Sequence, residues 1–263
     1  MQKILAFAQN HDLEVKKETI SGVLLHFLPV QADGTTICTL ADFNKVSVDI
    51  FLERKGQEPK AIVQGYLEDI LVGLYSQSTK FELNKTKRTN GYLVMLDLTP
   101  ARIVLNGEDI LRVKIKAENI AFTSLSAANS SIYFETIPAF GGQTAIPVLR
   151  MYPIGNGESI VDKEVGDSVV KITLATDLTT DYLASSKAKP VSVDVFANGY
   201  EKSVSESLVV AENIHYLDYN PDSAVQDLVL YTGAPLNSVR VKAKLNPAAD
   251  STAKVMVVAL QNI

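Results

Sequence analysis

Val46–Phe51 (VSVDIF) decides the fold class, because apolar and polar letters alternate in it and the pattern recurs at 191–196 as VSVDVF. Successive side chains of a β-strand point to opposite faces. The alternation therefore predicts a strand with Val46, Val48 and Ile50 turned toward a core. The recurrence predicts that the chain contains two halves of similar construction.

Two further pairs of segments support an internal repeat. Leu93–Leu96 (LVML) is echoed by Leu228–Tyr231 (LVLY), and Arg112–Lys116 (RVKIK) is echoed by Arg240–Lys244 (RVKAK). The order is the same in both halves, and the spacing shortens along the chain, as loop deletions in the second copy would produce. The alternative is that two strand-rich halves share alternating strings by chance, because alternation alone generates them.

Most remaining segments are short, mostly alternating runs separated by Gly and Asn, which are typical of strands joined by turns. Tyr66–Gln77 is different, because Leu67, Ile70, Leu71 and Leu74 recur at helical spacing. A single further helical turn is expected at Asp181–Lys187. The sequence therefore predicts an all-β fold of two tandem eight-stranded jelly-roll β-sandwiches with one or two short inserted helices.

The expected domain boundaries follow from composition. Residues 1–124 form the predicted first jelly roll, with an N-terminal segment at 1–20, and residues 131–263 form the second. Small polar residues at about 125–130 favour a linker between them. The strands predicted for the second half include Ile132–Ile137 and Ser203–Val210.

Charge and composition exclude several classes of protein. The net charge is −5, and no extended basic face is evident, so direct nucleic-acid binding is not expected. The single cysteine, Cys38, allows no intramolecular disulfide. There is no apolar run long enough to span a membrane and no secretory signal, so synthesis in the cytoplasm is expected.

No combination of residues predicts catalysis. The three histidines, His11, His26 and His215, lack metal-binding spacing, and no nucleophile elbow or phosphate-binding loop occurs. We therefore expect no enzymatic activity, no required cofactor and no small-molecule substrate.

Two acidic loops have alternative interpretations, as ligands of a structural calcium ion or as turn-forming residues. Their carboxylates are Asp177, Asp181, Asp218 and Asp222.

The N-terminus also has two interpretations. Residues 3–9 either form a short amphipathic helix, with Ile4, Leu5 and Ala8 on one side, or pack as a terminal segment on their own domain.

The paired VSVDIF/VSVDVF and RVKIK/RVKAK strands and the helix Tyr66–Gln77 together resemble the double jelly-roll major capsid proteins of tailless icosahedral viruses. In size the chain is similar to the coat protein of corticovirus-type phages, which have an internal membrane. The resemblance implies a homotrimer that forms a pseudo-hexagonal capsomer, contacts neighbouring capsomers and other capsid proteins, and resides in the virion. It further implies that Ile4, Leu5 and Phe7 face the membrane. The weak second helix departs from the family pattern.

Two other classes of protein remain as alternatives. A two-domain carbohydrate-binding or adhesin module would share the sandwich architecture, but such modules present exposed aromatic residues, and this chain has no Trp. A hydrolase on a jelly-roll scaffold would need a His/Glu or paired-carboxylate cluster, which the sequence does not indicate.

Overall fold

The computed structural model describes residues 1–7, 9–36, 46–75, 92–98, 102–117, 126–142, 145–176, 188–217 and 228–262. The chain divides into two compact units. Unit 1 contains Met1–Ile70, Phe81–Pro147 and Gln261–Ile263, and unit 2 contains Leu71–Lys80 and Val148–Leu260.

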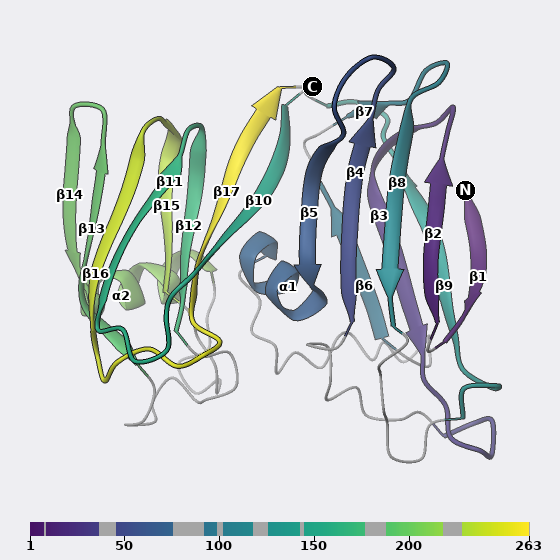
Figure 1. Cartoon of the computed structure of the whole chain (residues 1–263), viewed down its shortest axis with the longest axis horizontal. Coiled ribbons are helices and arrows are strands. Elements are labelled where there is room, and N and C mark those ends of the chain that lie inside the picture. The colour runs from purple at the N-terminus through teal and green to yellow at the C-terminus, as the bar shows by residue number, and fades with distance from the viewer. Residues whose placement is uncertain are drawn as a thin grey trace. The chain divides into compact units, whose positions relative to one another are not determined.

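The first pair of sheets is built from the N-terminal half of the chain (Figure 1). One sheet has the spatial order β1 (Gln2–Ala6), β9 (Ser131–Pro138), β3 (Thr19–Leu28) and β6 (Tyr92–Asp97), and β7 (Ile103–Val104) also pairs with β3. The other sheet has the order β2 (Asn10–Val15), β8 (Ile110–Lys116), β4 (Ser47–Glu53) and β5 (Lys60–Tyr66). Helix α1 (Leu67–Tyr75) directly follows β5.

The second pair of sheets repeats this arrangement. One sheet has the order β10 (Ala145–Pro153), β17 (Lys254–Asn262), β12 (Val169–Ala175) and β15 (Leu228–Leu236). The other has the order β11 (Ile160–Gly166), β16 (Val239–Asn246), β13 (Lys189–Ala197) and β14 (Tyr200–Ser205). Helix α2 (Glu206–Leu217) directly follows β14, as α1 follows β5.

The two strand orders correspond element by element, apart from the additional β7. In each copy the first of these strands pairs with the last. The chain passes from one sheet to the other between most consecutive strands, but β4 and β5, like β13 and β14, are neighbours within one sheet, which is the strand order of a jelly roll. The predicted fold class, an all-β chain of two tandem jelly-roll sandwiches with short inserted helices, is confirmed.

The repeated VSVDIF motif occupies equivalent strands, β4 and β13. Val48 and Ile50 are buried, whereas Ser47, Asp49 and Phe51 are half-buried on the other face. In the second copy Val193 and Val195 enter the core that fills the space between the sheets of unit 2. Val191 does not follow them, because the register shifts between Pro190 and Ser192, and its side chain is 58% exposed.

The predicted linker at about 125–130 is wrong. Ser126 donates its backbone N–H to the Val30 carbonyl, and the Ser130 hydroxyl accepts the N–H of Val30, so this segment connects β8 to β9 within unit 1. The following strand, β9, pairs with β1 and β3 and therefore completes the first jelly roll instead of beginning the second. Consequently the first jelly roll extends beyond residue 124 to Pro138, and the second begins with β10.

The structure contains a second helix, α2, that was not predicted from the sequence. Asp181–Lys187 lies outside the described residues, and α2 occupies most of the segment expected to be a strand at Ser203–Val210. The hydroxyl of Ser205 accepts the backbone N–H of Leu208 at 3.3 Å, which is an N-cap. The expectation of a weak second helix is therefore corrected, because α2 stands in the second copy where α1 does in the first.

The N-terminal segment forms a strand, β1, and not a helix. It pairs antiparallel with β9, so Leu5 lies opposite Ile132 and Ile4 lies opposite Tyr133. This pairing places alternate side chains on opposite faces of the sheet. The interpretation of a terminal segment packed on its own domain is therefore the one observed.

Candidate functional site

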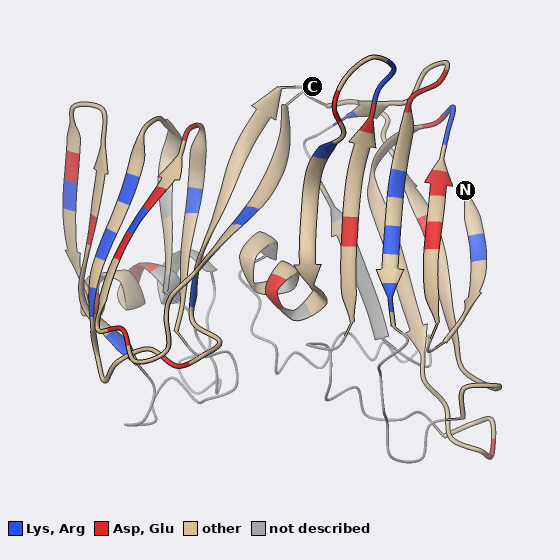
Figure 2. Cartoon of the chain, viewed as in Figure 1, with Lys and Arg blue, Asp and Glu red and all other residues tan. Residues whose placement is uncertain are grey.

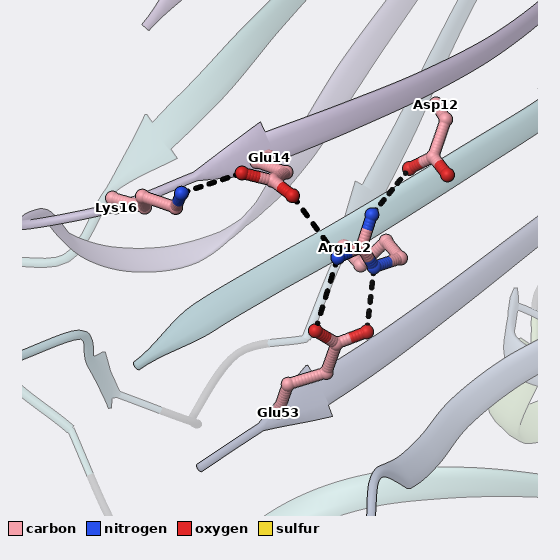
Figure 3. A network of polar contacts seen from close by, with 5 residues as sticks. All are labelled: Asp12, Glu14, Lys16, Glu53 and Arg112. Atoms are coloured by element: carbon pink, nitrogen blue, oxygen red, sulfur yellow. Dashed lines mark hydrogen bonds and ion pairs between the residues drawn. The ribbon is translucent and has the colours of Figure 1, made fainter. Parts of the chain in front are cut away.

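The outer face of the β2-β8-β4-β5 sheet carries a network of charged side chains around Arg112 (Figure 3). Arg112 Nε and Nη2 donate to the two carboxylate oxygens of Glu53 at 2.6 and 3.2 Å. Its Nη1 donates to Asp12 and its Nη2 to Glu14, each at 3.0 Å. One guanidinium on the central strand β8 therefore joins β2 and β4 through three carboxylates.

The network shifts the pKa values of Glu14 and Arg112 so that the charged form of each side chain is favoured. The Lys16 ammonium, 2.5 Å from Glu14, and Arg112 lower the pKa of the Glu14 carboxyl. The hydrogen bonds that Arg112 donates to Glu53 and, to a lesser extent, to Asp12 raise the pKa of Arg112. These shifts keep Glu14 and Arg112 charged at neutral pH, so the arrangement is suited to an electrostatic link between strands and not to proton transfer.

Two lysines of β8 extend this charged face. Lys114 lies 5.8 Å from the ring centroid of Phe51, a cation–π distance, and Lys116 lies 3.6 Å from the Asp49 carboxylate. Figure 2 shows blue positions along β8 flanked by red positions on β2 and β4.

Unit 2 repeats the charged face on the equivalent strands. Arg240 of β16 donates to both carboxylate oxygens of Asp162 at 2.6 Å, and this pairing lowers the pKa of Asp162. Lys242 lies 5.3 Å from the Phe196 ring, as Lys114 does from Phe51. The third carboxylate has no counterpart, because Asn198 occupies the position two residues after Phe196.

The strand registers match across the two copies. Arg112 lies between Glu14 and Phe51, and Arg240 lies between Glu164 and Phe196. The sequence stretch Asp12–Val15 (DLEV) therefore corresponds to Asp162–Val165 (DKEV). Sequence reasoning missed this pair, although the repeated Asp-x-Glu-Val letters were a signal that could have found it.

One of the predicted segment pairs is displaced by one residue. The letter match aligns Met95 with Leu230, yet Met95 pairs with the half-buried Leu24 and Leu230 pairs with the core residue Ile172. Strands β6 and β15 are equivalent in topology, but the matching letters do not occupy equivalent faces.

The predicted metal ligands, Asp177, Asp181, Asp218 and Asp222, all lie outside the described residues. Among the residues that the structure describes, no group of three or more His, Cys, Asp or Glu side chains is arranged to hold a metal ion. The three carboxylates around Arg112 lie together because each forms an ion pair with the Arg112 guanidinium, which occupies the place that a metal ion would need.

The three N-terminal residues predicted to face a membrane have different environments. Leu5 and Phe7 are 8% and 2% exposed, and the Phe7 ring lies edge-on to Phe27 at a centroid distance of 6.3 Å. Both are therefore core residues of unit 1, because burial in the sandwich leaves no side-chain surface for lipid. Ile4 is 77% exposed and is the one of the three that can contact another molecule.

No described helix is both long enough and apolar enough to cross a bilayer.

Comparison with known proteins finds similarity in structure and none in sequence. No protein-family model matches the chain, and no curated protein matches it by sequence. The crystal structure of the major capsid protein P2 from bacteriophage PM2 aligns with 99% of this chain and 97% of that chain, at a TM-score of 0.50 and 11% sequence identity. The chain is similar in fold to a phage major capsid protein. The alignment spans both jelly rolls, and not one sandwich alone.

Proposed function

We propose that the chain is the structural major capsid protein of a tailless icosahedral phage of the corticovirus type. In this proposal three copies form a pseudo-hexagonal capsomer, and capsomers tile the viral shell over an internal membrane. The protein is made in the host cytoplasm and resides in the virion. It acts by burying surface against copies of itself and other capsid proteins, without enzymatic activity.

The observation that carries this proposal is the correspondence of the whole chain, at nearly full length on both sides, with the major capsid protein P2 of bacteriophage PM2. Two jelly rolls per chain suit the proposal, because three chains then supply six similar sandwiches around one axis. The charged outer faces also suit it, since their carboxylates and cations pair with each other across neighbouring strands of the same chain.

Carbohydrate binding, the alternative function, gains no specific support. Its expected stacking platform would be a cluster of exposed aromatic rings. Among the described residues the large exposed aromatic side chains are Tyr66, Phe140 and Tyr200. They belong to β5, the β9–β10 connection and β14, three separate places in the sequence and topology.

Electron microscopy of the purified chain, alone and after coexpression with the other structural proteins of its source, tests the proposal. We expect flat particles with six-lobed outlines that tile into sheets or shells. Uniform single subunits under every condition, combined with retention on a glycan array, would overturn it in favour of the binding module.

Calcium is tested in parallel, because chelation should weaken the particles if Asp177, Asp181, Asp218 and Asp222 bind the ion.

A further inference from the structure

The outer face of the β10-β17-β12 sheet is buried within unit 2. Ile172 and Leu174 point into the core, so Lys171 and Thr173 lie on the outer face, where they are 4% and 0% exposed. Met256, which pairs with Thr173, is fully buried on the same face. An outer face at the surface of a single sandwich would instead be exposed to solvent.

The last turn of α1, whose residues 71–75 belong to unit 2, lies on this face. Lys171 Nζ donates to the carbonyl oxygens of Gly73 and Leu74 at 2.9 and 3.1 Å. Gly73 approaches the sheet so closely that an added Cβ would lie 2.6 Å from Leu149 Cδ1 and 3.2 Å from Met256 Sδ. A helix that follows the fifth strand of the jelly roll therefore covers this sheet.

Among the residues that the structure describes, the equivalent face in unit 1 is covered less completely. On the β1-β9-β3 sheet, Leu5 and Phe27 point inward to the core. The outer face carries a row of three side chains, because Tyr133 on β9 pairs with Ile4 on one side and with His26 on the other. Ile4 is exposed, and Tyr133 and His26 are half-buried. Leu24 and Leu28, also half-buried, extend the face along β3.

Helix α2 exposes two apolar residues near its N-terminus. Val209 is fully buried in the core of unit 2, whereas Leu208 is 46% exposed and Ala211 is exposed three residues later. Residues at this spacing share one face of a helix. Leu208 and Ala211 therefore present a small apolar stripe away from the core that α2 covers.

We propose that α2 of one copy packs, through Leu208 and Ala211, on the outer face of the β1-β9-β3 sheet of a second copy. The partner is a second copy because the same face in unit 2 is covered by the equivalent helix of the jelly-roll fold. The β1-β9-β3 face also combines apolar side chains with the polar groups of His26, Tyr133 and Glu135, which suits a protein interface better than a lipid-facing surface.

The contact is heterologous, because a helix meets a sheet, so its repetition gives a closed ring where the rotation between copies closes, as the proposed trimer requires. When α1 and α2 are aligned on their buried residues Ile70 and Val209, Glu212 of α2 stands at the position of Gly73 in α1. Because Glu212 has a side chain, we do not expect the backbone of α2 to approach the partner sheet as closely as Gly73 approaches its own. This inference rests on the proposed self-assembly and names the surfaces that would carry it.

Cysteine cross-linking between full-length chains tests the inference. In a Cys38→Ser background, one chain carries Ile4→Cys and another carries Ala211→Cys, and the two are mixed under mild oxidation. We expect about tenfold more cross-linked dimer in the mixture than in either chain alone, because the contact raises the local thiol concentration. Tyr200→Cys, at an exposed position on β14, replaces Ile4→Cys in the control mixture.

Native mass measurements separate the ways in which the inference can fail. Leu208→Asp should weaken self-association about tenfold, whereas Tyr200→Asp should leave it unchanged. An oligomer that forms without the cross-link and resists Leu208→Asp would overturn the inference and leave the proposed function standing. A chain that is monomeric throughout would overturn both. If Ile4→Asp abolishes vesicle flotation while the oligomer persists, the face binds membrane and the inference is wrong.

Discussion

Lys171 Nζ donates a hydrogen bond of 2.9 Å to the carbonyl oxygen of Gly73, so strand β12 supplies a donor to the last turn of α1. That turn contains no basic residue of its own. The carbonyl groups at the end of a helix have no partner within the helix, and a nearby amine satisfies them. This link, 98 positions apart in the chain, holds the end of α1 on the sheet.

The first prediction concerns pH. Burial lowers the pKa of Lys171 to about 7 from an ordinary value of 10.5. Between pH 7 and pH 10.5 the unfolded chain binds more protons at this lysine than the folded chain does. The folded state should therefore gain stability as pH rises through that window, by up to about 1.4 kcal/mol per pH unit. Below pH 7 both states are protonated, and this contribution becomes constant.

Lys171→Met removes the titrating group and should remove that slope. The measurement is the difference in unfolding free energy between the wild type and Lys171→Met at intervals from pH 7 to pH 10. Taking the difference cancels the other groups that titrate in this range. A difference that stays constant across the window would contradict the buried position of Lys171.

The second prediction concerns the close approach of Gly73. Gly73→Val should destabilise the protein by about 2 kcal/mol, because the added side chain overpacks against Leu149 and Met256. Ala211→Val, at an exposed position of α2, should cost only about 0.5 kcal/mol of helix propensity. Chemical denaturation compares the two. Equal losses would mean that the last turn of α1 does not lie against the sheet.

The third prediction distinguishes the two arginine networks. Arg112→Ala should cost about 1 kcal/mol, because Arg112 is 23% exposed and joins three carboxylates. Arg240→Ala should cost less, since Arg240 is 44% exposed and its Nε and Nη2 both donate to the single carboxylate of Asp162. Thermal unfolding at low and high salt checks both. The order of the two losses is the decisive result, and a reversed order would contradict the network.

The fourth prediction concerns the N-terminal strand. Phe7→Ala should destabilise the protein by about 3 kcal/mol, because it empties a buried ring position beside Phe27. Ile4→Ala should change stability by less than about 0.5 kcal/mol, because Ile4 is exposed. Chemical denaturation measures both losses. If Phe7→Ala left the free energy of unfolding unchanged and weakened only membrane association, Phe7 would not be a core residue.

Much of the fold could be predicted from the sequence, because burial on one face leaves a period of two in each strand. The repeated Val-x-Val and Arg-x-Lys segments locate β4, β8, β13 and β16, and the leucine stripe locates α1. The second helix could not be found by apolar letters, because Val204, Val209 and Val210 suit a strand as well. The N-cap at Ser205 was the signal that favoured a helix.

The domain boundary was misplaced for a related reason. Small polar residues mark any exposed connection, and those at 126–130 join two strands of one sandwich. Strand β9 returns to pair with β1, and that long-range pairing leaves no local pattern near residue 131. The charged face was not predicted, because the RVKIK and RVKAK segments indicated only a repeat. Asp12, Glu14 and Glu53 are brought to Arg112 by the register between strands, which the sequence does not display.

The central claim, assembly from copies of this chain, is tested most directly by the native mass of the purified protein over a range of concentrations. The account predicts a discrete species at about three times the chain mass of 28.6 kDa that persists on dilution. A species that keeps the mass of one chain at every concentration would contradict it.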